Sequence, residues 1–208
     1  MKKCNFIVVD GIDGSGKSEI VKMLHNYLNS KSKKYRILAT REPTNGIFGR
    51  QIRKMLRHDK DPGSNRKILL ELFIKDRRDH IQNTIYPFLN KPNEHKMNIV
   101  LCDRYYYSTI AFQGAQGLDM KLLVESNNSF RKPDISFILD IDPSLALKRI
   151  EFRQKEKFEQ LEFMKRIREN FLKLPKMMED DIKIIDASKT LNKVFENVRK
   201  EVDKIIKK

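Results

Sequence analysis

The sequence predicts an α/β fold in one domain, residues 1–208, with a parallel sheet between layers of helices. Two observations predict it. Short apolar runs alternate with longer segments of helical character, as in folds where a helix crosses over between parallel strands. A glycine-rich loop directly follows the first run, where open sheets of this class hold their ligands. The length suits a single domain with a substantial core.

Five strands are expected, and each is short and rich in Ile, Val, Leu or Phe. Near-continuous apolar runs of this length are typical of strands that are buried on both faces of a parallel sheet. The first four runs carry the signal clearly, and the fifth is weaker. The expected strands are residues 6–9, 36–40, 99–102, 135–139 and 183–186.

The segments between these strands are expected to be helical. The first helix begins at Lys17, directly after the glycine-rich loop. An Asp-Pro-Gly-Ser turn at residues 61–64 precedes the longest helix, in which Leu69, Phe73 and Ile81 fall near one stripe at helical spacing. The expected helices are residues 17–30, 46–56, 65–89, 107–114, 120–126, 143–151, 158–173 and 191–208.

Composition narrows the class of protein. No apolar stretch approaches the roughly 20 residues of a membrane span. The apolar run behind the basic start stops at Asp10 and serves better as a strand than as part of a signal peptide. We therefore expect a cytoplasmic protein with no membrane partner. Cys4 and Cys102 each lie beside an expected strand, so we expect two buried, reduced thiols and no zinc site or disulfide.

The net charge of +15 fits either nucleic-acid binding or an enzyme that handles multiply anionic substrates. The basic residues are dispersed over several segments, and acidic residues such as Glu151, Glu156 and Glu159 interleave in the later ones. This pattern is typical of solvated helix faces. We therefore expect no nucleic-acid partner.

A phosphate-binding loop follows the first strand, where residues 11–18 read Gly-Ile-Asp-Gly-Ser-Gly-Lys-Ser. The glycines let successive backbone N–H groups point at phosphate oxygens. The lysine can reach the β- and γ-phosphates, the last serine can ligate Mg²⁺, and the helix dipole adds to the attraction. The loop predicts a nucleoside triphosphate site made of Gly11, Asp13, Gly14, Ser15, Gly16, Lys17 and Ser18.

Charged residues also follow other strands where each strand ends, at the edge of the sheet where ligands bind. Asp103 comes directly after the third strand and can hold Mg²⁺, directly or through water, or orient an attacking oxygen. Arg104 offers a planar fork of donors to a phosphate. A lone Asp-Arg pair is more often an exposed ion pair, but its place beside a phosphate loop favours the functional interpretation.

Phe73 and Arg77 lie four residues apart on the expected long helix and therefore share a face. A ring and a guanidinium on one face can stack on a base and bind its edge. Taken alone, Phe73 is more often a core residue and Arg77 a surface cation. The four histidines show no ligand spacing and are expected to be ordinary surface or packing residues; they are His25, His58, His80 and His95.

Together these motifs resemble the thymidylate kinase family, whose members phosphorylate dTMP to dTDP. The most specific stretch runs from Asp103-Arg104-Tyr105 to Gln113-Gly114, and the resemblance covers nearly the whole chain in order. It implies a three-layer α/β/α P-loop kinase with a five-stranded parallel sheet and a short lid at about residues 149–157. ATP, Mg²⁺ and a homodimer are implied with it. The other matching motifs are Thr40-Arg41-Glu42-Pro43, Leu72-Phe73-x-x-Asp76-Arg77, Lys132-Pro133-Asp134 and Asp186-Ala187-Ser188.

The resemblance also implies roles for individual residues. Lys17, Asp103, Arg104 and a lid arginine would be catalytic, with Ser18 and Asp103 serving Mg²⁺. Within the phosphate loop, Asp13 would contact the 3′-hydroxyl of the dTMP sugar. In the dTMP pocket, Phe73 would stack on thymine and Arg77 would bind its O4 edge, with Arg41 and Pro43 at the thymidine. Arg104 would bind the phosphate. Thr109 and Gln113 would face the base or sugar, and Phe112 would crowd the 2′ position of the sugar.

The chain departs from the family at Asp10 and Phe112, where members often carry Glu and Tyr. The phosphate loop also has no basic residue at its variable positions. In this family, that version takes its catalytic cation from the lid. Arg153 is the expected candidate, with three further residues left open, Arg149, Lys155 and Lys157.

Two other functions compete with this interpretation. A kinase of another nucleoside monophosphate would differ at the residues that read the base, namely Phe73, Arg77 and Thr109. A nucleic-acid-dependent ATPase would need a basic stripe and usually a separate water-activating acid, and the sequence offers no such acid beyond Asp103.

Overall fold

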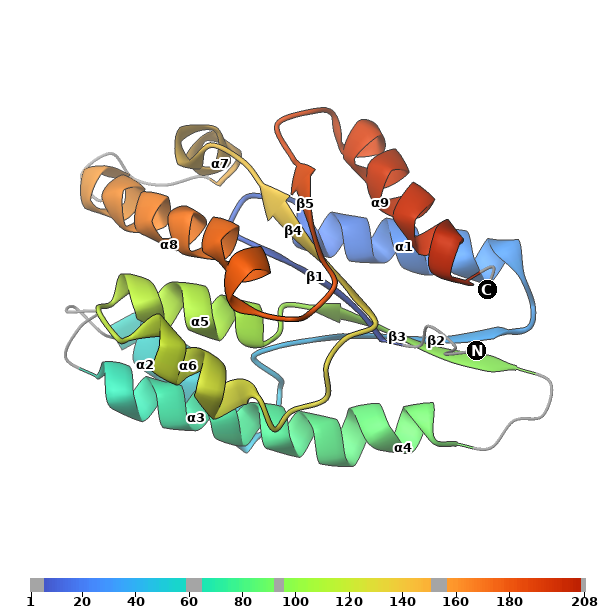
Figure 1. Ribbon diagram of the computed structural model, residues 1–208, viewed down its shortest axis with the longest axis horizontal. Helices are drawn as coiled ribbons and strands as arrows, with labels where there is room; N and C mark the ends of the chain where they lie inside the picture. Colours follow the sequence, from blue (N-terminus) through green and yellow to red (C-terminus); the bar gives the residue numbers. More distant parts are fainter. Residues whose placement is uncertain (1–5, 59–64, 92–95, 151–156, 207–208) are drawn as a thin grey trace.

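The computed structural model describes residues 6–58, 65–91, 96–150 and 157–206, and it confirms the expected α/β fold. One five-stranded sheet has the order β2-β3-β1-β4-β5, and every neighbouring pair is parallel (Figure 1). The carboxyl ends of all five strands therefore lie at one edge. The strands are β1 (Phe6–Gly11), β2 (Tyr35–Arg41), β3 (Met97–Asp103), β4 (Ile135–Asp140) and β5 (Ile182–Asp186).

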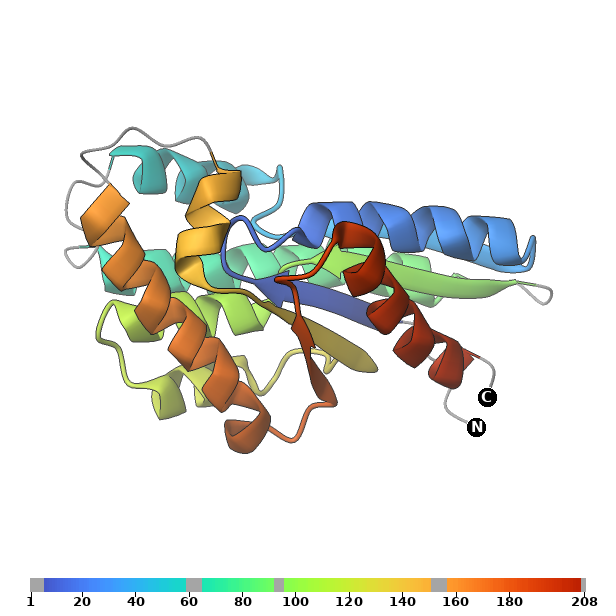
Figure 2. The same ribbon diagram turned by 90° about the horizontal axis from the view of Figure 1, so that it is seen from above.

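Helices cover both faces of the sheet. On one face α1 (Lys17–Lys31) packs on β1, β2 and β3, and α9 (Leu191–Ile206) packs on β5 and α1. On the other face lie α4 (Tyr86–Leu89), α5 (Tyr106–Ala115) and α8 (Lys157–Met177), and Figures 1 and 2 show α8 alongside α5. The remaining helices are α2 (Ile47–His58) against α3 (Arg66–His80), α6 (Met120–Asn127) against α5, and α7 (Pro143–Arg149) against α8.

The three central strands form the core of the sheet, whereas the two outer strands are only partly covered. Nearly every residue of β1, β3 and β4 is buried. We expected all five strands to be buried on both faces, and this is wrong for β2 and β5, whose residues are mostly half-buried or exposed. Each of these strands has a neighbour on one side only, because it forms an edge of the sheet.

The longest expected helix, residues 65–89, contains one wide turn. A π-helical segment, η1 (Ile81–Ile85), joins α3 to α4, and the Tyr86 N–H binds the Ile81 carbonyl five residues back. Pro87 explains the change of pitch, because proline has no N–H and its ring would clash with the carbonyl four residues earlier. The wide turn begins immediately after His80.

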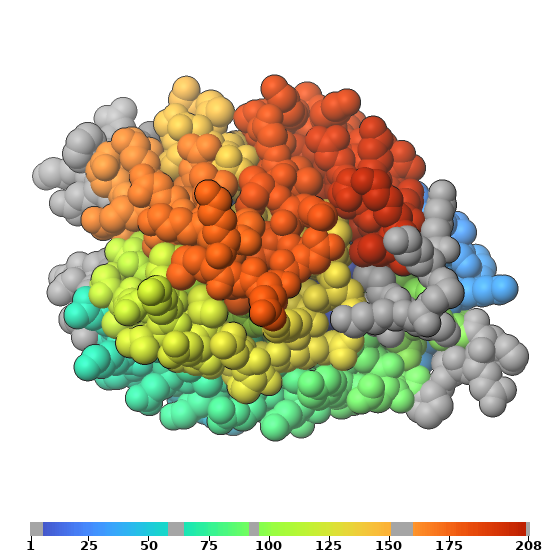
Figure 3. Space-filling model, in the orientation of Figure 1, coloured from blue at the N-terminus to red at the C-terminus, as the bar shows by residue number. Residues whose placement is uncertain are grey.

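Other differences from the expected elements are small. The helix expected over 143–151 ends at Arg149. The expected turn at 61–64 and Cys4 lie outside the described residues, while Cys102 is buried, and burial raises the pKa of its thiol. Figure 3 shows that the side chains of α8 meet those of α5 and α6 in a continuous surface, so α8 closes this side of the molecule.

Candidate active site

The phosphate loop connects β1 to α1 with an unusual backbone. Gly14 and Gly16 have φ of 78° and 94°, in the left-handed region that glycine adopts readily. The Lys17 ammonium is buried and donates a hydrogen bond of 2.7 Å to the Ile12 carbonyl of the same loop. Burial, together with the nearby Arg104 guanidinium, lowers the pKa of Lys17 to about 8. The surroundings of Lys17 therefore disfavour its charged form compared with a lysine in water.

A phosphate cavity of about 210 Å³ opens in front of this loop. Its walls come from the loop after β1, from the ends of β2 and β3 and from the first turn of α1, where backbone N–H groups lack intrahelical acceptors. Arg41, expected at the thymidine, lines this cavity and not the acceptor cavity described below. The lining residues are Asp13, Gly14, Gly16, Lys17, Ser18, Glu19, Arg41, Asp103 and Arg104.

Ser18 and Asp103 meet at this cavity, as the spacing of the motifs predicts. The Ser18 hydroxyl donates to Asp103 Oδ2 at 2.5 Å. Asp103 Oδ1 is buried and has no hydrogen-bond partner among the described residues. Mg²⁺ prefers hard oxygen ligands and usually takes only one or two carboxylates, with phosphates or water completing its shell. This pair of oxygens beside a phosphate cavity fits that ion.

Arg104 has a left-handed backbone, with φ of 71°, which costs about 1–2 kcal/mol for a residue other than glycine. Its N–H donates to the Val9 carbonyl at 3.0 Å. Its guanidinium donates to the Ser108 hydroxyl at 2.8 Å and to the Gly11 carbonyl at 3.1 Å, and it pairs with Asp13. Arg104 is therefore aimed at the phosphate loop before any ligand arrives.

Asp13 and Asp10 contact the same arginine in different surroundings. Desolvation in the loop works against ionisation of Asp13, although its side chain is largely exposed, but the Arg104 guanidinium and the Lys17 ammonium outweigh it and lower the pKa of this carboxyl. Complete burial raises the pKa of Asp10. Asp10 accepts hydrogen bonds from the backbone N–H groups of Gly11 and Ser108, at 2.8 and 3.0 Å, and from the Ser108 hydroxyl at 2.6 Å. Asp10 thus ties the phosphate loop to the loop after β3.

A second cavity, the acceptor cavity, has a volume of about 310 Å³. Asp13 and Arg104 line both this cavity and the phosphate cavity, so this ion pair marks the boundary between them. Of the residues expected at the acceptor, it also brings together Pro43, Phe73, Arg77, Thr109 and Phe112. Pro43 follows a cis peptide bond after Glu42.

Arg77 is only 1% exposed, although it lines the acceptor cavity. Its Nε donates to Glu42 Oε2 at 3.0 Å, Nη1 donates to Asn127 at 2.7 Å and Nη2 donates to Thr109 at 3.0 Å. The guanidinium is therefore fixed by two residues for which the sequence predicted no role, Glu42, which stands in the Thr40–Pro43 motif, and Asn127. Aromatic rings also surround its charge, those of Tyr105, Tyr106 and Phe130.

The far wall of the acceptor cavity belongs to α8, which sequence reasoning missed. Phe163, Met164, Ile167 and Phe171 line it, and the Phe163 ring meets the Phe112 ring edge-on with centroids 5.2 Å apart. These residues recur at helical spacing, which is the signal of any core-facing helix. Nothing in that pattern distinguishes a cavity wall from a packed core.

Some expected site residues lie elsewhere. Gln113 is fully buried on α5 and does not line the acceptor cavity, and its amide atoms have no hydrogen-bond partner in the described part of the chain. Arg153 and Lys155 lie outside the described residues, as does the side chain of Lys157. Arg149 binds the carbonyls of Ala187 at 3.2 Å and Gly14 at 3.5 Å, so it lies at the rim of the phosphate loop.

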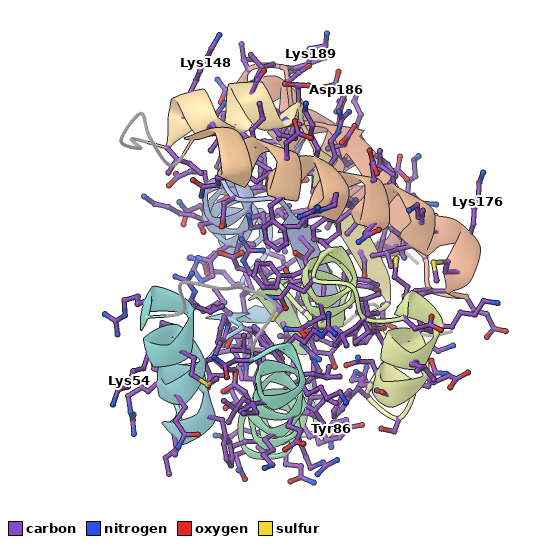
Figure 4. The ribbon with its side chains drawn as sticks, turned by 90° about the vertical axis from the view of Figure 1, so that its left-hand side faces the viewer. Lys54, Tyr86, Lys148, Lys176, Asp186 and Lys189 are labelled. Atoms are coloured by element: carbon purple, nitrogen blue, oxygen red, sulfur yellow. The ribbon has the colours of Figure 1, made fainter. Side chains whose placement is uncertain are left out.

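Basic side chains are dispersed over the surface. Figure 4 shows Lys148 and Lys189 projecting outward at one end of the molecule, and Lys54 and Lys176 projecting from two other sides. Lys189 lies 3.8 Å from Asp186. This dispersal is typical of solvated helix faces.

Within the described residues, no helix combines the length and apolar character that a membrane span needs.

Comparison with known proteins yields matches along nearly the whole chain. The sequence profile of the family described as thymidylate kinase matches residues 9–198. A probable thymidylate kinase of Thermococcus kodakarensis is 36% identical over 201 residues, covering 93% of this chain and 94% of the relative. A thymidylate kinase of Desulfotalea psychrophila is 34% identical over 206 residues, covering 97% of this chain and 95% of the relative. The crystal structure of thymidylate kinase from Ehrlichia chaffeensis superimposes with a TM-score of 0.74 at 29% identity, over 97% of this chain and 100% of the other.

Proposed function

Since this chain belongs to the thymidylate kinase family, we infer that it transfers the γ-phosphoryl group of ATP to dTMP, giving dTDP and ADP for dTTP synthesis. The observation that best supports this reaction at this site is that the phosphate cavity and the acceptor cavity meet at a shared boundary. Asp13 and Arg104 line both, with Lys17 on the phosphate side and Phe73 and Arg77 on the acceptor side. A donor phosphate and an acceptor phosphate bound in the two cavities would meet at this ion pair.

Catalysis at this boundary would rest on position and charge. The attacking oxygen of dTMP is already anionic, so no strong base is required. Lys17 would leave the Ile12 carbonyl for the β- and γ-phosphates, while Arg104, fixed by Ser108, would hold the acceptor phosphate in line. Gly11 and Ser15 complete the loop that encloses the donor phosphates.

The Ser18–Asp103 pair supports Mg²⁺ as the cofactor, because Asp103 Oδ1 is buried without a hydrogen-bond partner among the described residues. When bound, the ion would neutralise charge on the transferring phosphates. In the absence of the ion, Asp103 would orient the Ser18 hydroxyl. When Mg²⁺ binds, the Ser18 hydroxyl and an Asp103 carboxylate oxygen would be the ligands that the protein supplies. Arg41, which lines the same cavity, would add positive charge beside Asp13.

Recognition of dTMP would use the remaining wall of the acceptor cavity. Phe73 would stack on thymine beside Pro43, and Arg77 would donate to O4. Phe112 would crowd the 2′ position, supported from behind by Phe163. Thr109 accepts from Arg77 and would act mainly by holding it. Gln113 stays in the proposal as a residue that faces the base or the sugar, supported by the family resemblance alone.

The lid stays a proposal at about residues 149–157 of one P-loop kinase domain, 1–208. The contacts of Arg149 with Gly14 and Ala187 support a place for it on the ATP side of the loop. Arg153 then remains the proposed cation for the transferring phosphate. Replacing each arginine by Met distinguishes their roles. Arg153→Met should lower kcat, and Arg149→Met should raise KM for ATP.

We also propose a homodimer, implied by the family, and a cytoplasmic location, since the substrates are ATP and dTMP. Exposed Ile47 on α2 and Ile68 on α3, two helices that pack together, support an apolar interface there. Light scattering after size-exclusion chromatography should give twice the chain mass. Ile68→Lys should shift it to one chain mass, and Leu172→Lys on α8 should not.

The experiment that tests the function is a coupled ADP-release assay with a panel of acceptors: dTMP, dUMP, dCMP, dGMP and shikimate. We expect dTMP to give the highest kcat/KM and its product to be dTDP by chromatography. A clearly better nucleotide in the panel would assign a kinase of a different nucleoside monophosphate, and shikimate as the best acceptor would assign a kinase outside this class. ATP hydrolysis stimulated by DNA, without transfer to dTMP, would instead favour the nucleic-acid-dependent ATPase.

A further inference from the structure

A buried chain of polar side chains lies behind the acceptor cavity. The Glu42 carboxylate pairs with Arg77 through Oε2, at 3.0 Å from Nε and 2.8 Å from Nη2. Its other oxygen, Oε1, lies 3.1 Å from Nδ1 of His80. His80 Nε2 lies 2.7 Å from the Thr40 hydroxyl. Glu42, Arg77 and His80 are each at most 3% exposed, so water has little access to the bonds among these three residues.

The chemistry of the groups sets the direction of these bonds. An ionised carboxylate only accepts hydrogen bonds, so His80 Nδ1 must carry a proton and donate it to Glu42. The Thr40 hydroxyl holds the other ring nitrogen and prevents the imidazole from turning. With Oε1 satisfied by His80, the plane of the Glu42 carboxylate is fixed, and both of its contacts to Arg77 come from Oε2.

Fixing the Glu42 carboxylate leaves Arg77 with one donor to offer. The guanidinium has five N–H groups. Two contact Glu42, one donates to Asn127 and one to Thr109. The fifth, on Nη1, has no partner in the part of the chain that the structure describes, and Arg77 lines the acceptor cavity. The direction of that remaining donor depends on the plane of the carboxylate behind it.

His80 does not line the acceptor cavity. Together with Thr40 it lines a third cavity, of about 750 Å³, between α1, the end of β2 and α3, which shares Ser18, Arg41 and Asp103 with the phosphate cavity. His80 therefore acts on an acceptor only through Glu42 and Arg77. It also stands where the helix widens into the π turn η1.

We propose that His80 is a positioning residue for acceptor selection: its Nδ1–H orients Glu42 so that Arg77 presents one fixed donor to the base. This inference rests on the proposed function, in which Arg77 reads the O4 edge of thymine. A fixed donor favours thymine, which has an acceptor at O4, over cytosine, which has an amino group at the same place. A donor free to tilt discriminates less between the two bases.

Two near-isosteric variants separate this role from packing. In His80→Asn, the amide nitrogen can occupy the place of Nδ1 and keep the hydrogen bond to Glu42. In His80→Gln, the amide reaches the place of Nε2 instead. It then keeps the hydrogen bond to Thr40 and leaves Glu42 Oε1 unpaired. Both remove an imidazole from the same buried position. Arg77 is a poorer probe, because its removal would leave the buried Glu42 charge without a counter-ion and strongly destabilise the fold.

The experiment measures kcat/KM for dTMP and dCMP, and KM for ATP, in wild type, His80→Gln and His80→Asn, with thermal unfolding as a check of folding. For His80→Gln we expect KM for dTMP to rise about tenfold and the preference for dTMP over dCMP to fall about tenfold, with KM for ATP within about twofold. For His80→Asn we expect the preference to stay within about threefold of wild type.

Equal preference for dTMP in both variants and wild type, with changes in melting temperature alone, would overturn the inference and leave the proposed function intact. A wild-type enzyme that fails to phosphorylate dTMP would overturn the proposed function first, and this inference with it. If His80→Gln does not fold, Thr40→Val provides the test, because it frees the imidazole: a fall in preference of about threefold supports the role, and no change overturns it.

Discussion

Lys17 should take up protons from solution when ATP binds. In the ligand-free loop its ammonium is buried against Ile12 and close to Arg104, and its pKa is about 8. Phosphate oxygens would replace one neutral carbonyl by several negative charges, which restores the charged form. Binding of ATP near pH 8 should therefore draw a proton onto the lysine, and the affinity for ATP should fall as the pH rises above about 8.

The size of the effect follows from the same pKa. With a value of about 8, roughly a tenth of Lys17 is neutral at pH 7, about half at pH 8 and about nine-tenths at pH 9. Proton uptake per ATP bound should therefore be about 0.1, 0.5 and 0.9 at these three pH values. The terminal phosphate, with a second pKa of about 6, is already ionised at pH 8 and 9 and adds little there.

Isothermal titration calorimetry can measure this uptake directly. Titrations of ATP at one pH in two buffers of different ionisation enthalpy give the number of protons exchanged. Lys17→Arg is the matched control, because the guanidinium stays charged throughout this range. We expect its uptake at pH 8 and 9 to fall close to zero. The reasoning is refuted if uptake by the wild-type protein does not rise between pH 7 and 9, or if Lys17→Arg behaves identically.

Three further predictions concern the loop, the metal ligand and the sugar site. A Cβ on Gly14 would lie 2.4 Å from the Ala146 carbonyl oxygen, whereas a Cβ on Gly16 would meet nothing closer than 3.8 Å. Gly16→Ala should therefore lower the free energy of unfolding by roughly 1–2 kcal/mol, from backbone strain alone. Gly14→Ala should lower it by well more than that, because the clash adds to the strain. Equal losses in urea titrations would contradict this. Asp103→Asn should reduce Mg²⁺-dependent turnover roughly a hundredfold or more while the melting temperature stays within a few degrees; turnover near the wild-type rate would remove Asp103 from the metal site. Phe112→Ala should reduce the preference for dTMP over its ribonucleotide about tenfold in paired kcat/KM assays, and an unchanged ratio would place the 2′ position elsewhere.

On the phosphate side, the loop and its contact with the end of β3 could be predicted from the sequence, whereas the place of Arg41 could not. Gly14, Lys17 and Ser18 are close in the chain, and one strand–loop–helix connection fixes their geometry. Asp103 could be added because the third strand is parallel to the first, which brings its carboxyl end to the same edge of the sheet. Local spacing and one topological rule were therefore sufficient for the loop and this contact.

The acceptor side was predicted in part. Phe73 and Arg77 could be paired, because a separation of four residues on a helix defines a shared face. The same spacing does not show what that face meets. Arg77 could equally have been a surface cation, and only the packed structure shows it buried between Glu42 and Asn127.

The sequence by itself determined the succession of strands and helices along the chain and the residues that follow β1 and β3. Short-range spacing and apolar runs carry that information. The tertiary structure alone decided that Arg41 lines the phosphate cavity, that α8 forms a wall of the acceptor cavity, and that His80 contacts Arg77 through Glu42. These contacts join segments far apart in the chain. An apolar or polar stripe has the same pattern whether it meets a core, a cavity or a buried charge, so only the packing of one helix against another could distinguish them.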